Sequence, residues 1–272
     1  MFSQFLHKFF KYIRFCTQGG YTNLHVATIT EGALLQDKRI IITGGSDGIG
    51  LAMANTFIHQ GAKVLICGRR QEKLDEAKSK INSDKLFSMQ WDVSLIDSLE
   101  TKLQEAIKIL GGLDIFFNNA AFLAAEKKTM DFFNTTLQTN VTAPYVLCRL
   151  VGDYYKQNNK EQGGKIINTS SINANQSSTH PYFLSKSALN SLTRGYAKEF
   201  AAYNIIVNAI APGYCASSIN WRDVSRNAYD SDTANHRITT PQDVASLALF
   251  LASDMSNAII GQVLTIDGGS TL

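Results

Sequence analysis

The chain has 272 residues, of which 44% are hydrophobic and 18% charged, so it is long enough for one large α/β domain or two small ones. Its formal net charge of +3 is too small to indicate a nucleic-acid-binding protein, and no basic stripe with interleaved aromatic residues is present. The four cysteines and five histidines are scattered, without the spacing of a disulfide framework or a metal site. These features predict a protein of a reduced compartment, the cytoplasm, that binds neither nucleic acid nor metal.

The first 36 residues differ from the rest of the chain. Apolar residues at positions 2, 5, 6, 9, 10 and 13 follow helical spacing, basic residues lie at positions 8, 11 and 14, and no acidic residue precedes Glu31. The apolar run is interrupted too often for a transmembrane helix or a clear secretory signal. We therefore expect residues 1–36 to form an amphipathic N-terminal extension that packs on its own domain or on a partner subunit. A membrane-surface helix over residues 1–15 or a cleaved transit peptide would give the same pattern, so membrane-associated and organellar locations remain alternatives.

Beyond the extension, short apolar runs alternate with amphipathic stretches as far as the C-terminus. Apolar runs predict strands at residues 38–43, 63–67, 86–91, 113–119, 164–170, 205–210 and 262–266. Helices are expected after the first strand to about residue 60, over 71–81, about 94–110, about 130–157 and about 181–203, and from Thr240 and Pro241 onward. This alternation predicts an α/β fold, a single doubly wound Rossmann-type domain over residues 37–272 with a seven-stranded parallel sheet. The polar segment 214–240 is too long for a simple connection and is predicted to be a substrate lid.

The first predicted strand runs directly into "TGGSDGIG", residues 43–50. Glycines at 44, 48 and 50, between a buried strand and a helix, suit a turn whose backbone approaches a pyrophosphate at the helix N-terminus. A tight strand-to-helix turn without a ligand would use the same residues. The spacing also differs from the usual G-x-G-x-x-G of the dinucleotide fingerprint, so the turn alone leaves both interpretations open.

The stretch "SSTHPYFLSK", residues 177–186, places a tyrosine and a lysine one helical turn apart. Such a pair is common on ordinary helices. It also suits catalysis, because hydride transfer to a carbonyl leaves a developing alkoxide that needs a proton donor. A free tyrosine has a pKa of about 10, and the Lys186 ammonium is expected to lower the pKa of Tyr182.

Further motifs follow the glycine-rich turn in chain order. They are "WDV" at 91–93, "NNAA" at 118–121, "TNV" around Asn140, "TSSIN" around Ser171, "VNAIAPGY" at 207–214 and "IDGG" at 266–269. Together with the turn and the tyrosine–lysine pair, they make residues 37–272 resemble the short-chain dehydrogenase/reductase family, and within it the 3-oxoacyl-reductase-like branch. Each motif alone is weak, but the complete set in this order is highly specific.

The resemblance implies an active site. Asn140, Ser171, Tyr182 and Lys186 match the family's catalytic tetrad, in which the serine polarises the substrate carbonyl and the asparagine holds a proton-relaying water. Ser170 is the alternative to Ser171, because the gap to the tyrosine is shorter than usual in the family and only one of two neighbours on a strand can face the substrate. The implied cofactor-binding residues are Gly44, Ser46, Asp47, Gly48, Ile49, Gly50, Arg69, Arg70, Asp92, Val93, Asn119, Ala120, Tyr182, Lys186, Pro212, Gly213 and Ser217.

The end of the second predicted strand bears on the cofactor. An acidic residue there would bind the ribose hydroxyls of NAD, but this chain has "CGRR", and Arg69 or Arg70 can pair with the 2'-phosphate of NADP. Asp47 argues the other way, since many NADP-dependent relatives carry a basic residue at that position. The sequence therefore favours NADP and leaves NAD possible.

We expect an oxidoreductase that transfers a hydride between NADP(H) and a carbonyl or hydroxyl group of a small organic substrate. Other reactions of the family, such as enoyl reduction or sugar dehydration, are alternatives, and so is a non-catalytic NADP-binding regulator, because fold does not determine function. The resemblance also implies a homodimer or homotetramer built on the long helices at about 130–157 and 181–203.

Overall fold

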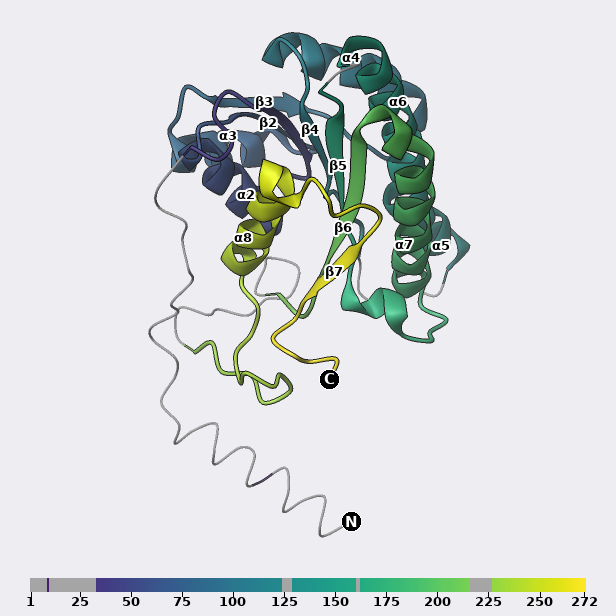
Figure 1. Ribbon diagram of the computed structural model, residues 1–272. Coiled ribbons are helices and arrows are strands. Elements are labelled where there is room, and N and C mark those ends of the chain that lie inside the picture. Colours follow the sequence, from purple (N-terminus) through teal and green to yellow (C-terminus); the bar gives the residue numbers. More distant parts are fainter. Residues whose placement is uncertain (1–8, 10–32, 124–128, 160–161, 216–226) are drawn as a thin grey trace.

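Seven parallel strands form one sheet in the order β3-β2-β1-β4-β5-β6-β7 (Figure 1). The computed structural model describes residues 9, 33–123, 129–159, 162–215 and 227–272. The strands are β1 (Arg39–Thr43), β2 (Lys63–Gly68), β3 (Leu86–Gln90), β4 (Ile115–Asn118), β5 (Gly164–Thr169), β6 (Ile205–Pro212) and β7 (Val263–Ile266). The chain leaves β1 toward β3 and then returns to build β4 on the other side of β1. This confirms the doubly wound fold, and it puts a switch point, where such sheets bind ligands, between β1 and β4.

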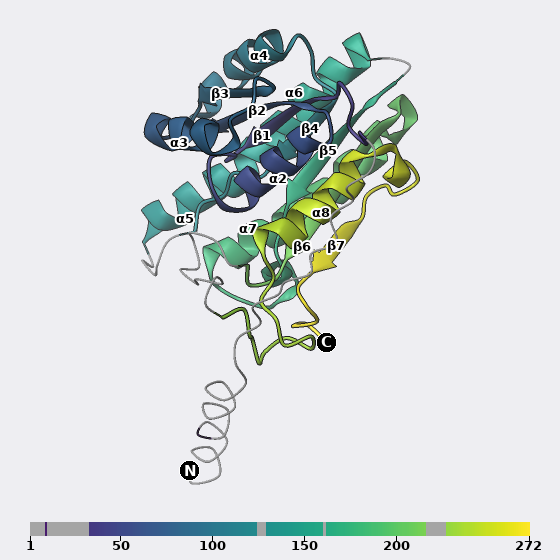
Figure 2. The same ribbon diagram turned by 90° about the vertical axis from the view of Figure 1, so that its left-hand side faces the viewer.

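Helices cover both faces of the sheet. They are α2 (Gly48–His59), α3 (Gln71–Ile81), α4 (Leu99–Leu110), α5 (Met130–Leu137), α6 (Ala143–Asn158), α7 (Pro181–Phe200) and α8 (Pro241–Ala252). Figure 2 shows α2 and α8 together in front of the sheet, whereas α6 and α7 lie on its opposite face (Figure 1). The single helix predicted for residues 130–157 is interrupted by a π-helical turn at Gln138–Thr142, which separates α5 from α6.

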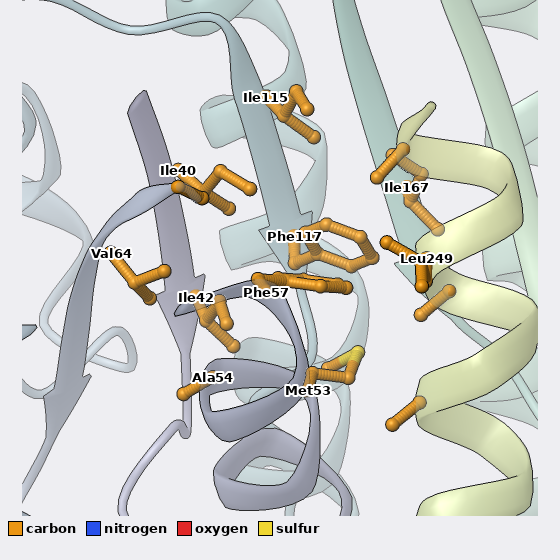
Figure 3. Close-up of a cluster of buried hydrophobic side chains, with 14 of the residues drawn as sticks. Ile40, Ile42, Met53, Ala54, Phe57, Val64, Ile115, Phe117, Ile167 and Leu249 are labelled. Atoms are coloured by element: carbon orange, nitrogen blue, oxygen red, sulfur yellow. The ribbon is translucent and has the colours of Figure 1, made fainter. Parts of the chain in front are cut away.

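The buried strands supply two cores, one on each face of the sheet. Ile40 and Ile42 of β1 point into the core beneath α2 and α8, whereas Ile41 points into the core beneath α4, α6 and α7. In the first core the rings of Phe57 and Phe117 lie 5.1 Å apart (Figure 3). A strand buried on both faces is apolar at every position, which is why these strands appear in the sequence as unbroken apolar runs.

The two ends of the predicted domain extend the fold. Leu35 is fully buried and its N–H donates to the carbonyl of Gln60, so residues 33–36 pack on the domain, and the rest of the expected extension lies outside the described residues apart from residue 9. In the predicted lid, Ala228 and Ile238 are buried and joined by a backbone hydrogen bond of 2.9 Å. Residues 227–240 are therefore packed on the domain, and residues 216–226 lie outside the described chain.

Candidate active site

A pocket of about 310 Å³ opens at the carboxyl ends of the strands, across the switch point between β1 and β4. Most of the residues that the sequence predicts for the site line this pocket. They are Gly44, Ser46, Asp47, Gly48, Ile49, Gly50, Arg69, Arg70, Asp92, Val93, Asn119, Ala120, Ser171, Tyr182, Lys186, Pro212 and Gly213. Asn140 does not line it, and Ser217 lies outside the described residues. The tertiary structure thus brings segments from six strands to one opening.

Thr43 ties the two strands of the switch point together. Its Oγ1 accepts hydrogen bonds from the N–H groups of Asn119 (2.9 Å) and Ala120 (3.0 Å), and it donates to the carbonyl of Phe117 (3.1 Å). The Asn119 amide continues this connection, donating to the carbonyls of Thr43 and Gly44 and accepting from the Thr169 hydroxyl. One hydroxyl and one amide therefore hold the floor of the pocket across β1, β4 and β5.

The glycines of the first turn are required partly by its own packing. Gly44 has a φ of +65°, and a Cβ there would lie 2.9 Å from the Cα of Ala120. A Cβ on Gly50 would lie 2.2 Å from the carbonyl oxygen of Gly44, so only glycine lets α2 begin this close to the turn. The sequence alone did not separate this requirement from approach to a phosphate.

The start of α2 can hold an anion. Asp47 caps the helix, and its carboxylate accepts from the N–H of Gly48 at 2.7 Å. Within the described chain, the N–H groups of Ser46, Ile49 and Gly50 donate to no acceptor. Free N–H groups at a helix N-terminus fit a phosphate group. The residues present thus fit the pyrophosphate of a dinucleotide, with the Asp47 carboxylate as a negative charge beside it.

Basic and polar side chains surround the far end of the pocket. Arg69 and Arg70 are exposed, and neither guanidinium has a hydrogen bond or an ion pair with another described residue. Arg70 is the N-cap residue just before α3, but its side chain makes no capping hydrogen bond. Asp92 is already engaged, because its Oδ1 accepts from the N–H and the hydroxyl of Ser94. Free guanidinium groups at this end suit a phosphate on the adenosine ribose.

The two adjacent serines point in different directions. The Ser170 hydroxyl donates to the Asn190 side chain at 2.5 Å, in the contact between β5 and α7. Ser171 begins the short turn Ile172–Asn175, where its hydroxyl accepts from the N–H of Asn173, and it forms a hydrogen bond with the Tyr182 side chain. Of the two, Ser171 is therefore the serine next to the tyrosine.

Lys186 and Tyr182 share the floor of the pocket without a direct hydrogen bond. The Lys186 ammonium donates to the carbonyl of Thr169 at 2.7 Å and lies 5.5 Å from the centre of the Tyr182 ring. Burial lowers the pKa of Lys186 to about 8. Burial also raises the pKa of Tyr182, and the hydrogen bond with Ser171 offsets part of this rise. The pKa of Tyr182 is therefore raised overall, whereas the sequence predicts a lowered value, because burial is the dominant effect.

Asn140 lies in the π-helical turn between α5 and α6, where its side chain is buried. Its amide oxygen accepts from the N–H of Phe122 at 2.7 Å, and its amide nitrogen donates to the Phe122 carbonyl and the Ser185 hydroxyl. Ser185 in turn donates to the carbonyl of Tyr182 at 2.7 Å. Both amide N–H groups of Asn140 are therefore engaged, so the side chain holds the loop after β4 and the start of α7 and has no N–H left for a water.

Several residues of the site are absent from the sequence prediction. Phe122, Leu123, Ile172, Asn173 and Tyr214 also line the pocket. Thr43 and Thr169 hold its floor, the latter through a backbone carbonyl. Loop residues that line a pocket wall show no periodicity in the sequence. A backbone carbonyl can come from any residue, so its role as an acceptor cannot be predicted from the residue type. Thr43 alone had a signal, its position at the end of a buried strand before the glycine-rich turn.

Fold and pocket define a dinucleotide-binding α/β protein with a serine, tyrosine and lysine beside the cofactor position. The family model described as Enoyl-(Acyl carrier protein) reductase matches residues 44–271. A glucose 1-dehydrogenase of Gluconobacter oxydans is 34% identical over 249 residues, covering 86% of this chain and 92% of that protein. A 3-oxoacyl-(acyl-carrier-protein) reductase of Chlamydia muridarum is 32% identical over 248 residues, covering 87% of this chain and 98% of that protein.

Solved structures agree with these relatives. A short chain dehydrogenase from Burkholderia cenocepacia J2315, crystallised in complex with NADP, superposes with a TM-score of 0.78 at 30% identity, covering 88% of this chain and 99% of that one. The chain belongs to the short-chain dehydrogenase/reductase family, and it is an oxidoreductase. The family predicted from the motifs is confirmed. No helix within the described ranges is long and apolar enough to cross a membrane.

Proposed function

We propose that this protein transfers a hydride reversibly between NADP(H) and a carbonyl or hydroxyl carbon of a small organic substrate. The observation that carries the proposal is the group of Ser171, Tyr182 and Lys186 in one pocket, with the Tyr182 hydroxyl bonded to Ser171. This pocket also holds helix N–H groups and two arginines, Arg69 and Arg70, that have no partner within the described part of the chain. The geometry supports a bound dinucleotide next to a proton donor.

Ser171 and Tyr182 have different roles at the oxygen of the substrate carbonyl or hydroxyl group. Bound NADP(H) supplies or accepts the hydride. Ser171 can donate a hydrogen bond to the substrate oxygen and so stabilise the negative charge that develops there. The Tyr182 phenol gives its proton to that oxygen in reduction and takes it back in oxidation. Its raised pKa keeps the phenol protonated at neutral pH, which suits the role of acid in the reductive direction.

Lys186 contributes a buried positive charge at the pocket floor. Because it is 2% exposed and bonded to the Thr169 carbonyl, its ammonium is fixed at the edge of the pocket. From that position it can bind a ribose hydroxyl of the cofactor, as the family resemblance implies. It also stabilises any phenolate that Tyr182 forms during the reaction.

The choice of NADP rests on Arg69 and Arg70. A guanidinium without an internal partner is available for a forked bond to the 2'-phosphate. The Burkholderia cenocepacia relative, which was crystallised with NADP, supports this choice. Changing both arginines to alanine should raise the KM for NADPH at least tenfold and leave the KM for NADH unchanged. An equal loss with both cofactors, or a wild-type preference for NADH, would contradict the assignment.

The reaction itself is tested by Tyr182→Phe. A panel of ketones, aldehydes and 3-oxoacyl thioesters is screened with NADPH, and the variant is compared on the best substrate. General acid catalysis accounts for about 10²–10⁴-fold of rate, so kcat should fall by that factor while NADPH binding, followed by fluorescence, is retained. Turnover by the variant at the wild-type rate would refute the assigned role of the tyrosine.

A second candidate is reduction of an enoyl thioester, which the description of the matching family model favours. The same panel discriminates between the two reactions when it includes 2-enoyl thioesters. Activity on these substrates, with none on ketones, would replace carbonyl reduction as the function. The water relay implied for Asn140 stays a prediction, and in this structure it would have to use groups other than the asparagine N–H donors.

We also propose a homodimer or homotetramer that assembles on α6 and α7. Tyr145 on α6 and Tyr203 just after α7 are about half exposed, so two large aromatic side chains, a residue type enriched at interfaces, are available on these helices. Light scattering after size-exclusion chromatography would give the oligomeric state. A cytoplasmic location is proposed as well, supported by Cys67 and Cys148, which are buried free cysteines among the described residues. Fractionation of cells that express the full chain would test it.

A further inference from the structure

His180 occupies the position immediately before the helix that carries Tyr182. It is the N-cap residue of α7, and its ring Nδ1 accepts a hydrogen bond from the backbone N–H of Tyr182 at 3.2 Å. The helix then continues with Pro181, which has no N–H, so the Tyr182 N–H is the first that needs an acceptor. The capping side chain of this helix therefore acts directly on the backbone of the proposed proton donor.

The imidazole ring is held in place by its neighbours. The His180 ring meets the ring of Phe132 edge-on at 5.7 Å, and it lies 5.6 Å from the ring of Phe183. Its backbone is fixed as well, because the His180 N–H donates to the Ser178 hydroxyl at 3.0 Å. Phe132 belongs to α5 and is buried, so the ring is packed between α5 and α7. Such a ring cannot swing away from the Tyr182 N–H without disturbing both contacts.

Both backbone polar groups of Tyr182, its N–H and its C=O, form hydrogen bonds with side chains. Its N–H donates to His180, and its carbonyl accepts from Ser185, whose hydroxyl is in turn bonded by the Asn140 amide. The N–H and C=O groups of the residue are thus each bonded to a buried or packed side chain. Of these partners, only the imidazole can change its charge near neutral pH.

Protonation of the imidazole would change Nδ1 from a hydrogen-bond acceptor that caps the helix into a donor that cannot cap it. An Nδ1 that accepts a hydrogen bond carries no proton, so the capping form is the neutral tautomer with its proton on Nε2. In the imidazolium form Nδ1 also carries a proton, which faces the Tyr182 N–H, and its positive charge lies at the positive end of the helix dipole. Both effects oppose the first turn of α7.

Among the described residues, no anion is bonded to the His180 ring to compensate for that charge. The ionisable residue on α5 is Asp131, next to Phe132, and those in the first two turns of α7 are Tyr182 and Lys186. None of the three has a hydrogen bond or an ion pair with His180 among the described residues. The cap hydrogen bond to Tyr182 is therefore the interaction that the proton would break.

We infer that His180 is a positioning residue for Tyr182, one that holds the phenol in the pocket while the imidazole is neutral and releases the first turn of α7 when it is protonated. This inference rests on the proposed role of Tyr182 as proton donor. It makes the turnover of the enzyme sensitive to pH through a group that touches neither substrate nor cofactor.

The test uses two variants of the full-length protein. In His180→Asn the amide oxygen can cap the helix but does not titrate, whereas in His180→Ala the acceptor is lost. The kcat for NADPH-dependent reduction is measured from pH 5 to 8 for the wild type and both variants. We expect kcat of the wild type to fall increasingly below that of His180→Asn as the pH is lowered from 8 to 5, toward a limit of about fivefold, the factor that corresponds to the loss of a typical helix cap. The two should agree at pH 8, where His180→Ala should stay below both.

A second readout does not depend on turnover. With ¹⁵N-tyrosine labelling, the Tyr182 amide resonance is identified by its disappearance in Tyr182→Phe, and its chemical shift is followed from pH 5 to 8. The shift should follow a single proton in the wild type and stay constant in His180→Asn. Identical pH profiles of kcat for the wild type and His180→Asn, or a Tyr182 resonance that does not respond in the wild type, would overturn the inference.

The two proposals fail in different ways. If Tyr182→Phe keeps full activity, the proposed proton donor is wrong, and the amide titration still decides whether His180 caps the helix in a pH-dependent way. If Tyr182→Phe is inactive but the wild type and His180→Asn share one profile, the proton donor stands and the positioning role of His180 is wrong.

Discussion

Replacing Thr43 by valine removes one hydroxyl from the point where β1 meets β4. Valine has nearly the shape of threonine, so packing at this residue, which is 1% exposed, is preserved. Three hydrogen bonds are lost: those from the N–H groups of Asn119 and Ala120 and that to the carbonyl of Phe117. At about 1 kcal/mol each, the free energy of unfolding should decrease by about 3 kcal/mol. In a chain of this size the melting temperature should fall by roughly 6–12 °C.

The same change should weaken cofactor binding, because the two strand ends form the floor of the pocket. Unfolding in urea gives the free energy, and fluorescence titration with NADPH gives the dissociation constant. Thr43→Ser is the matched control, since it keeps the hydroxyl and loses only a methyl group, at a cost of about 1 kcal/mol. If Thr43→Val proves as stable as Thr43→Ser and binds NADPH equally well, the hydroxyl does not hold the switch point and the reasoning is wrong.

Two further predictions concern stability. Asp114→Ala removes the acceptor of the Arg39 guanidinium and backbone N–H (2.7–2.8 Å), so the free energy of unfolding should fall by about 3 kcal/mol. Glu76→Ala, at an exposed ion pair, should have a much smaller effect, and equal losses in urea unfolding would contradict this. Lys165, whose ammonium donates to the Ser253 carbonyl, has its pKa lowered by burial from 10.5 to about 8. The native state therefore binds fewer protons than the unfolded state above pH 8, so raising the pH from 7.5 to 9 should stabilise the wild type relative to Lys165→Met by about 1 kcal/mol. A difference that stays constant over this range would rule out the shift.

The architecture could be predicted from the sequence because buried parallel strands have a local signal. Each is an unbroken apolar run, and each amphipathic stretch between them covers one face of the sheet. The interruption of the helix at Gln138–Thr142 had no such signal. It depends on Asn140 bonding to Phe122, 18 residues earlier in the chain, which is a contact that only the folded protein makes.

The proposed catalytic group was predicted in part. Tyr182 and Lys186 lie one helical turn apart, so they are close together wherever the helix packs in the fold. The choice between Ser170 and Ser171 needed the position of α7, since Asn190 on that helix takes the first hydroxyl and Tyr182 lies beside the second. The pKa of Tyr182 likewise follows from burial and from the contact with Ser171, neither of which the spacing along the chain reveals.

The sequence by itself determined the fold, the family and the glycine-rich turn, because these depend on the order of residue types along the chain. The tertiary structure decided which side chains meet: that Thr43 joins two strands, that Arg69 and Arg70 lie at the pocket without a partner among the described residues, and that His180 caps the helix of Tyr182. The physical reason is that hydrogen bonds and burial depend on distances between segments far apart in the sequence. Local pattern sets the elements, and their packing sets the chemistry of the site.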